Sequence, residues 1–323
     1  MKVFVTRRLP KTVMGRLEKA NEISELRVNP HDRVLTRDEL EEGTAWCDIL
    51  LSQLVDPIDG ALMDCNPGLK LIANYAVGYN NIDVDAAIER SIPVTNTPGV
   101  LDDSTADLTW ALLMAVARRI VEADGYMRTG KYDGWAPTLL MGTDVHHKTL
   151  GIIGLGRIGF ALAQRAQGFG MHIIYSDLEP KPYAAEVNAE YIDMYTLLRK
   201  SDFVSRHPFY DTKSHHLIDE REFKQMKNSA FLINVSRGPV VNEKALVKAL
   251  KAGEIAGAAL DVYEHEPKME PELAEMDNVV IVPHIASASL ETRTAMGNIA
   301  VDNVLARCRG DALTTCLNPE TAG

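Results

Sequence analysis

A glycine-rich turn between two short apolar runs constrains the fold of this chain more than any other feature. The stretch TLGIIGLGRIG (149–159) reads as an apolar strand followed by three glycines in the spacing Gly154-x-Gly156-x-x-Gly159. A run of helical character, FALAQRAQGFG, comes next, and HIIYSD closes the unit as a second strand. A strand–helix–strand unit of this kind predicts two parallel strands in one sheet.

The glycines in this turn predict a dinucleotide site. Gly154 allows the tight turn, Gly156 lets the backbone approach a pyrophosphate, and Gly159 lets helix and strand pack closely. The pyrophosphate would lie on the helix N-terminus, at Arg157 and Ile158, where N–H groups lack helical acceptors and the helix dipole favours an anion.

Asp177, at the end of the second strand, bears on the choice of cofactor. A carboxylate there can accept hydrogen bonds from both ribose hydroxyls, and it repels a 2′-phosphate. It therefore favours NAD over NADP. Lys181 lies just past Asp177 and Arg206 ends the next predicted strand, so either could reach a phosphate and the choice stays open.

The rest of the chain continues the alternation of strand and helix. Strands are expected at 2–6, 48–51, 69–74, 92–95, 150–154, 172–176, 202–206, 230–234, 256–261 and 279–282. This alternation of strands and helices predicts an α/β fold with parallel sheets covered by helices on both faces. One long helix is expected at 101–130, an exposed excursion at 131–147 and a final helix at 288–308. The final helix and tail should pack on the first domain, which makes the second domain an insertion.

Composition excludes several classes of function. The 34 basic and 45 acidic residues give a net charge of −11, so nucleic acid and anionic membranes are poor partners. Four cysteines without a CxxC pair fit reduced thiols in a cytoplasmic protein and no metal site. The N-terminal apolar run is too short for a signal peptide, and no apolar stretch has the length of a membrane span.

Four polar residues follow predicted strands of the second domain. Arg237 lies in FLINVSRGPVV, Asp261 and Glu266 in AALDVYEHEP, and His284 in VVIVPHIASAS. Each alone has an ordinary interpretation as a surface ion pair, a solvated acid or a loop histidine. Together they suit chemistry on a C–OH or C=O group, because arginine fits a carboxylate and a carboxylate favours a protonated histidine.

These motifs resemble the D-isomer-specific 2-hydroxyacid dehydrogenases. GLGRIG, NVSRGPVV, LDVYEHEP, VPHIASAS, YAVGYNNIDVDAA and STADLTWALLMAVARR carry the resemblance, which covers essentially the whole chain. WAPTLLMGTDV and the stretch from KALVKALKAG onward are most similar to glyoxylate/hydroxypyruvate reductases. The resemblance implies two Rossmann-like doubly wound domains, with a substrate domain at 1–99 and 288–323 and an inserted NAD-binding domain at 100–287.

The resemblance also implies a role for each site residue in the reduction of a 2-keto acid by NADH. Arg237 would clamp the substrate carboxylate, His284 would protonate the ketone oxygen, and Glu266 would hold the histidine. Asp261 would orient the nicotinamide amide. Further cofactor contacts are implied at Thr105, His207 and Val235. Substrate contacts from the other domain are implied at Leu54, Val77 and Gly78.

The family resemblance further implies a homodimer formed through the long helix and the 131–147 excursion, with Trp135 as a candidate contact to the neighbouring active site. One departure affects the segment VSRHPFYD, where Arg206 replaces an apolar residue of the family and Pro208 comes one place early. Two alternatives stay open: an activity of the 3-phosphoglycerate dehydrogenase type, and a non-enzymatic NADH-sensing protein.

Overall fold

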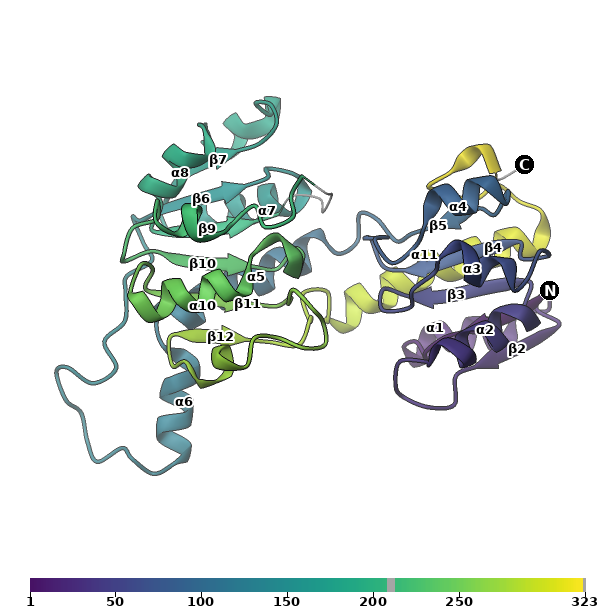
Figure 1. The fold of residues 1–323 in the computed structure, drawn as a ribbon, viewed down its shortest axis with the longest axis horizontal. Helices are drawn as coiled ribbons and strands as arrows, with labels where there is room; N and C mark the ends of the chain where they lie inside the picture. Colours follow the sequence, from purple (N-terminus) through teal and green to yellow (C-terminus); the bar gives the residue numbers. More distant parts are fainter. Residues whose placement is uncertain (208–212, 322–323) are drawn as a thin grey trace. The chain divides into compact units, whose positions relative to one another are not determined.

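The computed structural model describes residues 1–207 and 213–321, so Pro208 lies outside the described residues. The chain divides into two compact units (Figure 1). Unit 1 comprises Met1–Leu101 and Ala288–Gly323, and unit 2 comprises Asp102–Ser287. Both chain termini therefore belong to unit 1.

Unit 1 is built on a parallel sheet with the strand order β2-β1-β3-β4-β5. Its strands are β1 (Lys2–Val5), β2 (Glu25–Val28), β3 (Ile49–Gln53), β4 (Leu71–Tyr75) and β5 (Val94–Thr95). Its helices are α1 (Lys11–Lys19), α2 (Arg37–Trp46), α3 (Gly60–Asp64), α4 (Val84–Glu89) and α11 (Leu290–Arg309), and a 3₁₀ turn, η4 (Pro319–Thr321), comes near the C-terminus.

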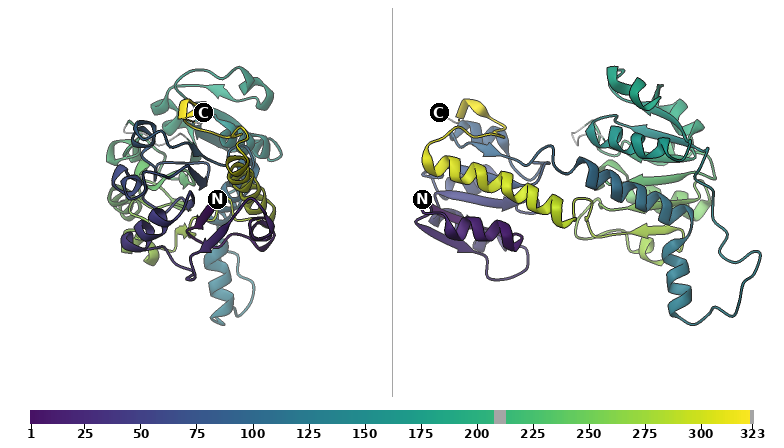
Figure 2. Two further views of the ribbon diagram at one scale, coloured as in Figure 1. Left: turned by 90° about the vertical axis from the view of Figure 1, so that its right-hand side faces the viewer. Right: turned by 180° about the vertical axis from the view of Figure 1, so that it is seen from behind.

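The C-terminal helix α11 completes unit 1, although it follows all of unit 2 in the sequence. It lies along the sheet beside α1 (Figure 2). The Tyr75 hydroxyl donates to the Arg293 carbonyl over 2.7 Å, and a side chain at Gly297 would overlap Val13. Ser289 caps the helix start, with its Oγ accepting from the Thr292 amide at 3.0 Å. The expected packing of the last helix on the first domain is therefore present in the structure.

Unit 2 holds a longer parallel sheet with the order β12-β11-β10-β9-β6-β7-β8. Its strands are β6 (Thr149–Ile153), β7 (His172–Ser176), β8 (Glu190–Tyr191), β9 (Phe203–Arg206), β10 (Phe231–Asn234), β11 (Gly257–Leu260) and β12 (Val279–Ile281). Its helices are α5 (Asp102–Ala117), α6 (Ile120–Arg128), α7 (Arg157–Gln167), α8 (Met194–Lys200), α9 (Glu220–Phe223) and α10 (Glu243–Ala252). Three 3₁₀ turns complete it: η1 (Pro182–Val187), η2 (Gly238–Val240) and η3 (Pro271–Glu275).

Helices cover both faces of this second sheet, as the parallel arrangement requires. One apolar core joins α5 and α7 to one face, and a second joins α8, α9 and α10 to the other. Figure 1 views the sheet from the α10 side, and the reverse view in Figure 2 has α5 in front. The predicted α/β class with parallel sheets in two Rossmann-like domains is confirmed. Among the described residues, no helix is both long and apolar enough to cross a membrane.

The expected single helix over 101–130 is wrong, because the chain breaks between α5 and α6. Arg119 adopts the left-handed conformation, with φ of 53° and ψ of 37°. The Thr143 amide donates to the Ala117 carbonyl over 2.8 Å, and a side chain at Gly142 would overlap that same carbonyl. The excursion therefore returns to the end of α5. There the Thr143 amide bonds to the Ala117 carbonyl, which a continuous helix would need for its own hydrogen bonding.

Candidate active site

The glycine-rich turn has the backbone geometry that its sequence predicts. Gly154 has φ of +90°, which favours glycine, and a side chain at Gly159 would overlap the Gly154 carbonyl. At Gly156, the N-cap of α7, an added Cβ would meet no atom within 4 Å. The turn thus packs tightly against its own strand and leaves open space at the helix N-terminus, where Arg157 and Ile158 begin α7. These residues fit the pyrophosphate of a dinucleotide.

Asp177 is fixed beside this turn by backbone amides. Its Oδ2 accepts from the Leu155 amide at 3.0 Å, and its Oδ1 accepts from the Leu178 amide at 2.7 Å. The Lys181 ammonium lies 3.3 Å from Oδ1. Burial works to lower the pKa of Lys181, but the hydrogen bond and charge of Asp177 outweigh it and raise that pKa. The acid predicted to bind the ribose and a cation that suits a phosphate therefore lie side by side.

The other predicted cofactor contacts lie on α5 and at the ends of β9 and β10. Thr105 is buried in α5, and its carbonyl accepts from the Thr109 hydroxyl over 2.7 Å. His207 follows β9, with Nε2 2.9 Å from the Ser205 Oγ. Burial, helped by the charge of Arg206, lowers the pKa of His207 to about 3, so the ring is neutral. Val235 is buried directly after β10.

Arg206 is buried in the sheet, with 0% of its surface exposed. Its neighbours in register are Ile153 on β6 and Asn234 on β10. None of the three guanidinium nitrogens has a hydrogen-bond partner in the described part of the chain. Burial lowers the pKa of Arg206 to about 9, which leaves the side chain charged at neutral pH.

His284 and Glu266 form a hydrogen-bonded pair at the ends of β12 and β11. His284 Nδ1 lies 2.9 Å from Glu266 Oε2, and the Tyr263 amide donates to Glu266 Oε1 over 3.1 Å. Burial works to raise the pKa of Glu266. The hydrogen bond and charge of His284, the Tyr263 amide and the charge of Arg237 outweigh burial and lower that pKa. The carboxylate is therefore ionised throughout the neutral range.

The backbone of His284 is strained, and Asp261 holds it in place. His284 has φ of +53°, a conformation that histidine adopts only when its surroundings enforce it. The buried Asp261 accepts from the Ile285 amide at 2.6 Å and from the Ala286 amide at 2.9 Å. Burial raises the pKa of Asp261 despite these bonds. The acid predicted to meet the cofactor thus also fixes the loop of His284.

Arg237 lies in the turn between β10 and η2. Its carbonyl accepts from the Asn234 side-chain amide over 3.1 Å, and its Nη1 donates to the Ser236 carbonyl over 2.7 Å. Burial lowers the pKa of Arg237, while the charge of Glu266 works to raise it. The structure therefore brings Arg237, Glu266 and His284 together at one edge of the sheet in unit 2, where their three strands end.

The predicted substrate contacts of unit 1 follow two adjacent strands. Leu54 comes directly after β3, and Val77 and Gly78 come after β4. All three are partly exposed. The Val77 carbonyl accepts from Asn96 Nδ2 over 2.9 Å, and the Gly78 carbonyl accepts from Asn74 Nδ2 over 3.0 Å.

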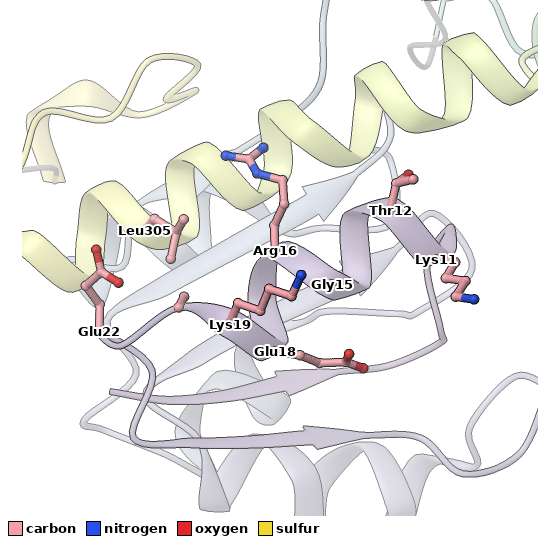
Figure 3. Close-up of a pocket in the computed structure, with 9 residues that line it drawn as sticks. Lys11, Thr12, Gly15, Arg16, Glu18, Lys19, Glu22 and Leu305 are labelled. Carbon is pink, nitrogen blue, oxygen red and sulfur yellow. The ribbon is translucent and has the colours of Figure 1, made fainter.

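A hollow of about 730 Å³ in unit 1 lies apart from these residues (Figure 3). It is lined mainly by α1, with Leu305 contributed by α11. Arg16 points toward α11, where it pairs with Asp302 at 2.6 Å, and Lys19 lies along α1 toward Gly15. The hollow has mixed charge and none of the predicted site residues, so we do not assign it a function.

Sequence reasoning missed three residues that support the site: Glu264, Glu243 and His216. Hydrogen bonds join their side chains and amides, and Glu264 lies two residues before Glu266. Glu264, the other acid of YEHEP, had only the ordinary interpretation of a solvated loop acid. The one signal in the sequence was the position of Glu243 at the start of a helix, where a carboxylate is favoured.

Comparison with known proteins places this arrangement in a family. Residues 110–286 match the model of the D-isomer specific 2-hydroxyacid dehydrogenase, NAD binding domain. A glyoxylate reductase of Thermococcus litoralis is 48% identical, over 99% of this chain and 97% of that protein.

Solved structures agree with this family assignment. A Thermus thermophilus protein has a TM-score of 0.91 at 41% identity, covering 98% of this chain and 100% of its own. An NADPH-dependent glyoxylate/hydroxypyruvate reductase of Sinorhizobium meliloti, solved with NADP and malonate, has a TM-score of 0.85 at 31% identity, with 98% and 97% covered. The chain belongs to the D-isomer specific 2-hydroxyacid dehydrogenase family, NAD-binding oxidoreductases that act on the CH–OH group of 2-hydroxy acids.

Proposed function

We propose that this enzyme reduces a small 2-keto acid of the glyoxylate or hydroxypyruvate type with NADH. The observation that carries the proposal is the His284–Glu266 pair at 2.9 Å, beside Arg237 on the sheet edge that also bears the glycine-rich turn. This edge suits a substrate with a carboxylate next to a ketone. Arg237 can bind the carboxylate, His284 can donate a proton to the ketone, and the glycine-rich turn can hold the dinucleotide.

Each residue has a defined task in this mechanism. Arg237 binds the substrate carboxylate and polarises the carbonyl. NADH, held at the glycine-rich turn, would supply the hydride for the reduction. Since Nδ1 of His284 is engaged by Glu266, its Nε2 gives the proton to the carbonyl oxygen, which completes the alcohol. Glu266 keeps the ring oriented and favours its protonated form.

Cofactor binding is assigned to residues 100–287 and substrate binding to residues 1–99 and 288–323. Within the cofactor domain, Asp261 orients the nicotinamide amide, and Asp177 accepts from the ribose hydroxyls. The amides from Gly154 to Gly159 hold the pyrophosphate. Further contacts to the cofactor come from Thr105, His207 and Val235. In the substrate domain, the backbone of Val77 and Gly78 binds the carboxylate beside Leu54.

The first test is oxidation of NADH and NADPH by the purified protein with a panel of keto acids. The panel is glyoxylate, hydroxypyruvate, pyruvate, 2-ketoisocaproate and 3-phosphohydroxypyruvate. The proposal expects the highest kcat/KM with NADH and glyoxylate or hydroxypyruvate. The highest kcat/KM with 3-phosphohydroxypyruvate would instead assign the enzyme to phosphorylated substrates, and the highest with 2-ketoisocaproate to branched ones.

We also propose a homodimer formed through α6 and the excursion that follows it. Every residue of α6 is at least partly exposed. The exposed large apolar side chains of this region are Ile120, Val121, Met127, Tyr132, Trp135 and Met141. Exposed apolar side chains of this number suit contact with a second copy of the chain. Light scattering should give twice the chain mass of 35.6 kDa, and a monomer would contradict the proposal. The four free thiols fit a cytoplasmic enzyme.

A further inference from the structure

Two glutamates of unit 2 hold each other through their own backbone amides. The Glu264 amide donates to Glu243 Oε1 over 2.7 Å, and the Glu243 amide donates to Glu264 Oε2 over 3.1 Å. The remaining oxygen of Glu243 accepts from the Glu270 amide at 2.8 Å. The remaining oxygen of Glu264 lies 2.7 Å from His216 Nε2. Both carboxylates are thus fully engaged in a paired arrangement, which we call the glutamate clasp.

The pKa values of the two carboxylates in the clasp shift in opposite directions, and Glu264 has His216 as a partner. Burial raises the pKa of Glu243, although the amides of Glu264 and Glu270 oppose this. Burial also works to raise the pKa of Glu264, but the hydrogen bond from His216 and the amide of Glu243 outweigh it and lower that pKa. The side chain of Glu264 is only 13% exposed, and the bonds from His216 and the Glu243 amide both favour its charged form.

The clasp joins the two segments that carry the proposed catalytic groups. Glu264 lies two residues before Glu266, and the Oε1 of Glu266 accepts at 3.1 Å from the amide of Tyr263, the residue before Glu264. The backbone of His216 donates to the Pro239 carbonyl over 2.9 Å, two residues after Arg237. Gly238 packs so closely on Tyr263 that any side chain there would overlap the Tyr263 carbonyl. A shift of Glu264 would therefore move the backbone of both catalytic segments.

We propose that His216 and Glu264 are positioning residues for the reduction. They hold the 263–266 backbone so that the Glu266 carboxylate stays within hydrogen-bond distance of His284 and Arg237 keeps its place beside it. This inference rests on the proposed function, because it assigns the clasp a task only if Glu266 and His284 perform the chemistry. A displacement of about 1 Å in such a support is enough to reduce turnover about 100-fold.

A matched pair of variants tests this role. In His216→Gln the side-chain nitrogen can occupy the place of Nε2 and still donate to Glu264. In His216→Asn the side chain is one methylene shorter, and its nitrogen cannot reach that place. Both variants are neutral amides, so they differ only in reach. His265→Ala is the control, because that neighbouring ring is 78% exposed and lies 3.9 Å from Glu264.

The measurements are kcat, KM for glyoxylate and the dissociation constant of NADH, with folding checked by circular dichroism. We expect His216→Asn to lose kcat about 10- to 100-fold, with KM and NADH binding changed less than about threefold. His216→Gln should stay within about threefold of the wild-type kcat, and His265→Ala should match the wild type. Glu264→Ala should behave as His216→Asn does.

Glu266→Gln, measured in parallel, separates the two ways in which this inference can fail. If Glu266→Gln loses turnover while folded His216→Asn and Glu264→Ala keep it, the clasp has no positioning role. If Glu266→Gln itself keeps wild-type turnover, the proposed function of Glu266 fails and the clasp has nothing to position. Should the Asn variant not fold, Glu264→Ala gives the same comparison, since it removes the acceptor that His216 uses. Wild-type kcat in that variant would also overturn the inference.

Discussion

His284 Nδ1 lies 2.9 Å from Glu266 Oε2, although the two residues follow different strands and are 18 positions apart in the chain. The contact exists because β11 and β12 are parallel neighbours, so their carboxyl ends meet at one edge of the sheet. Asp261 reinforces it by accepting both amides that follow His284. The pairing of these two strands and the bonds of Asp261 therefore fix the backbone that brings His284 and Glu266 together.

Replacing Glu266 by glutamine should change the pH dependence of reduction. The pKa of Glu266 is lowered, so the carboxylate is charged across the neutral range and stabilises the protonated form of its partner. Without that charge, the pH above which kcat declines should fall, and kcat itself should fall about 10- to 100-fold. The check is a pH–rate profile with NADH saturating. An unshifted profile would mean that Glu266 does not tune the proton donor.

The same pair should affect stability at acid pH. A carboxylate with a lowered pKa stabilises the folded state above its unfolded value of 4.5, and this contribution is lost as pH falls through the folded value. Urea unfolding of the wild type and Glu266→Gln should therefore differ most at neutral pH and converge as the solution is acidified below about 4.5. A constant difference across that range would contradict the lowered pKa.

Arg237→Lys tests the planar fork at the carboxylate site. A lysine keeps a positive charge but cannot make two parallel hydrogen bonds to a carboxylate. The loss of one charged hydrogen bond should lower kcat/KM for glyoxylate about 10- to 100-fold, while the KM for NADH stays close to that of the wild type. If the KM for NADH worsened by the same factor as kcat/KM for glyoxylate, Arg237 would have a structural role and not a role in substrate binding.

Asp177 and Lys181 together should set the choice between NADH and NADPH. Their 3.3 Å contact means that removing the carboxylate frees the ammonium for a 2′-phosphate. Asp177→Ser should lower kcat/KM with NADH about tenfold and raise it with NADPH. The double variant Asp177→Ser/Lys181→Ala should lose the gain with NADPH and keep the loss with NADH. Retained NADH preference in the single variant would remove Asp177 from cofactor selection.

Arg206 should destabilise the protein relative to an apolar residue. A buried guanidinium without a partner in the described residues bears a desolvation cost that leucine does not. Arg206→Leu should raise the free energy of unfolding by about 1–3 kcal/mol, measured by urea denaturation without cofactor. A decrease would mean that an anion or a carboxylate compensates the charge.

The sequence predicted most of the second sheet and the site on its edge for one physical reason. Parallel strands buried on both faces are continuous apolar runs, and the polar residues directly after them must meet at one edge, as Arg237, Glu266 and His284 do. The family, the α/β class and the NAD-binding character were confirmed. The roles of individual residues stay predictions.

The features that the sequence did not predict depend on contacts between residues that are far apart in the chain. Strand β2 has no apolar run, because it is a half-exposed edge strand paired only with β1. The break at Arg119 depends on the return of Thr143 to the end of α5. The bond between His216 and Glu264 joins residues 48 positions apart, and nothing in either segment alone signals it.

The most direct test of the account is a single-turnover measurement of NADH oxidation by glyoxylate in the wild type and in His284→Ala. NADH binding is measured in the same samples by fluorescence titration. The account predicts that the variant binds NADH as the wild type does and loses the oxidation rate by about two to four orders of magnitude. A wild-type rate in His284→Ala would contradict the assignment of this histidine as the proton donor, and with it the mechanism built on the His284–Glu266 pair.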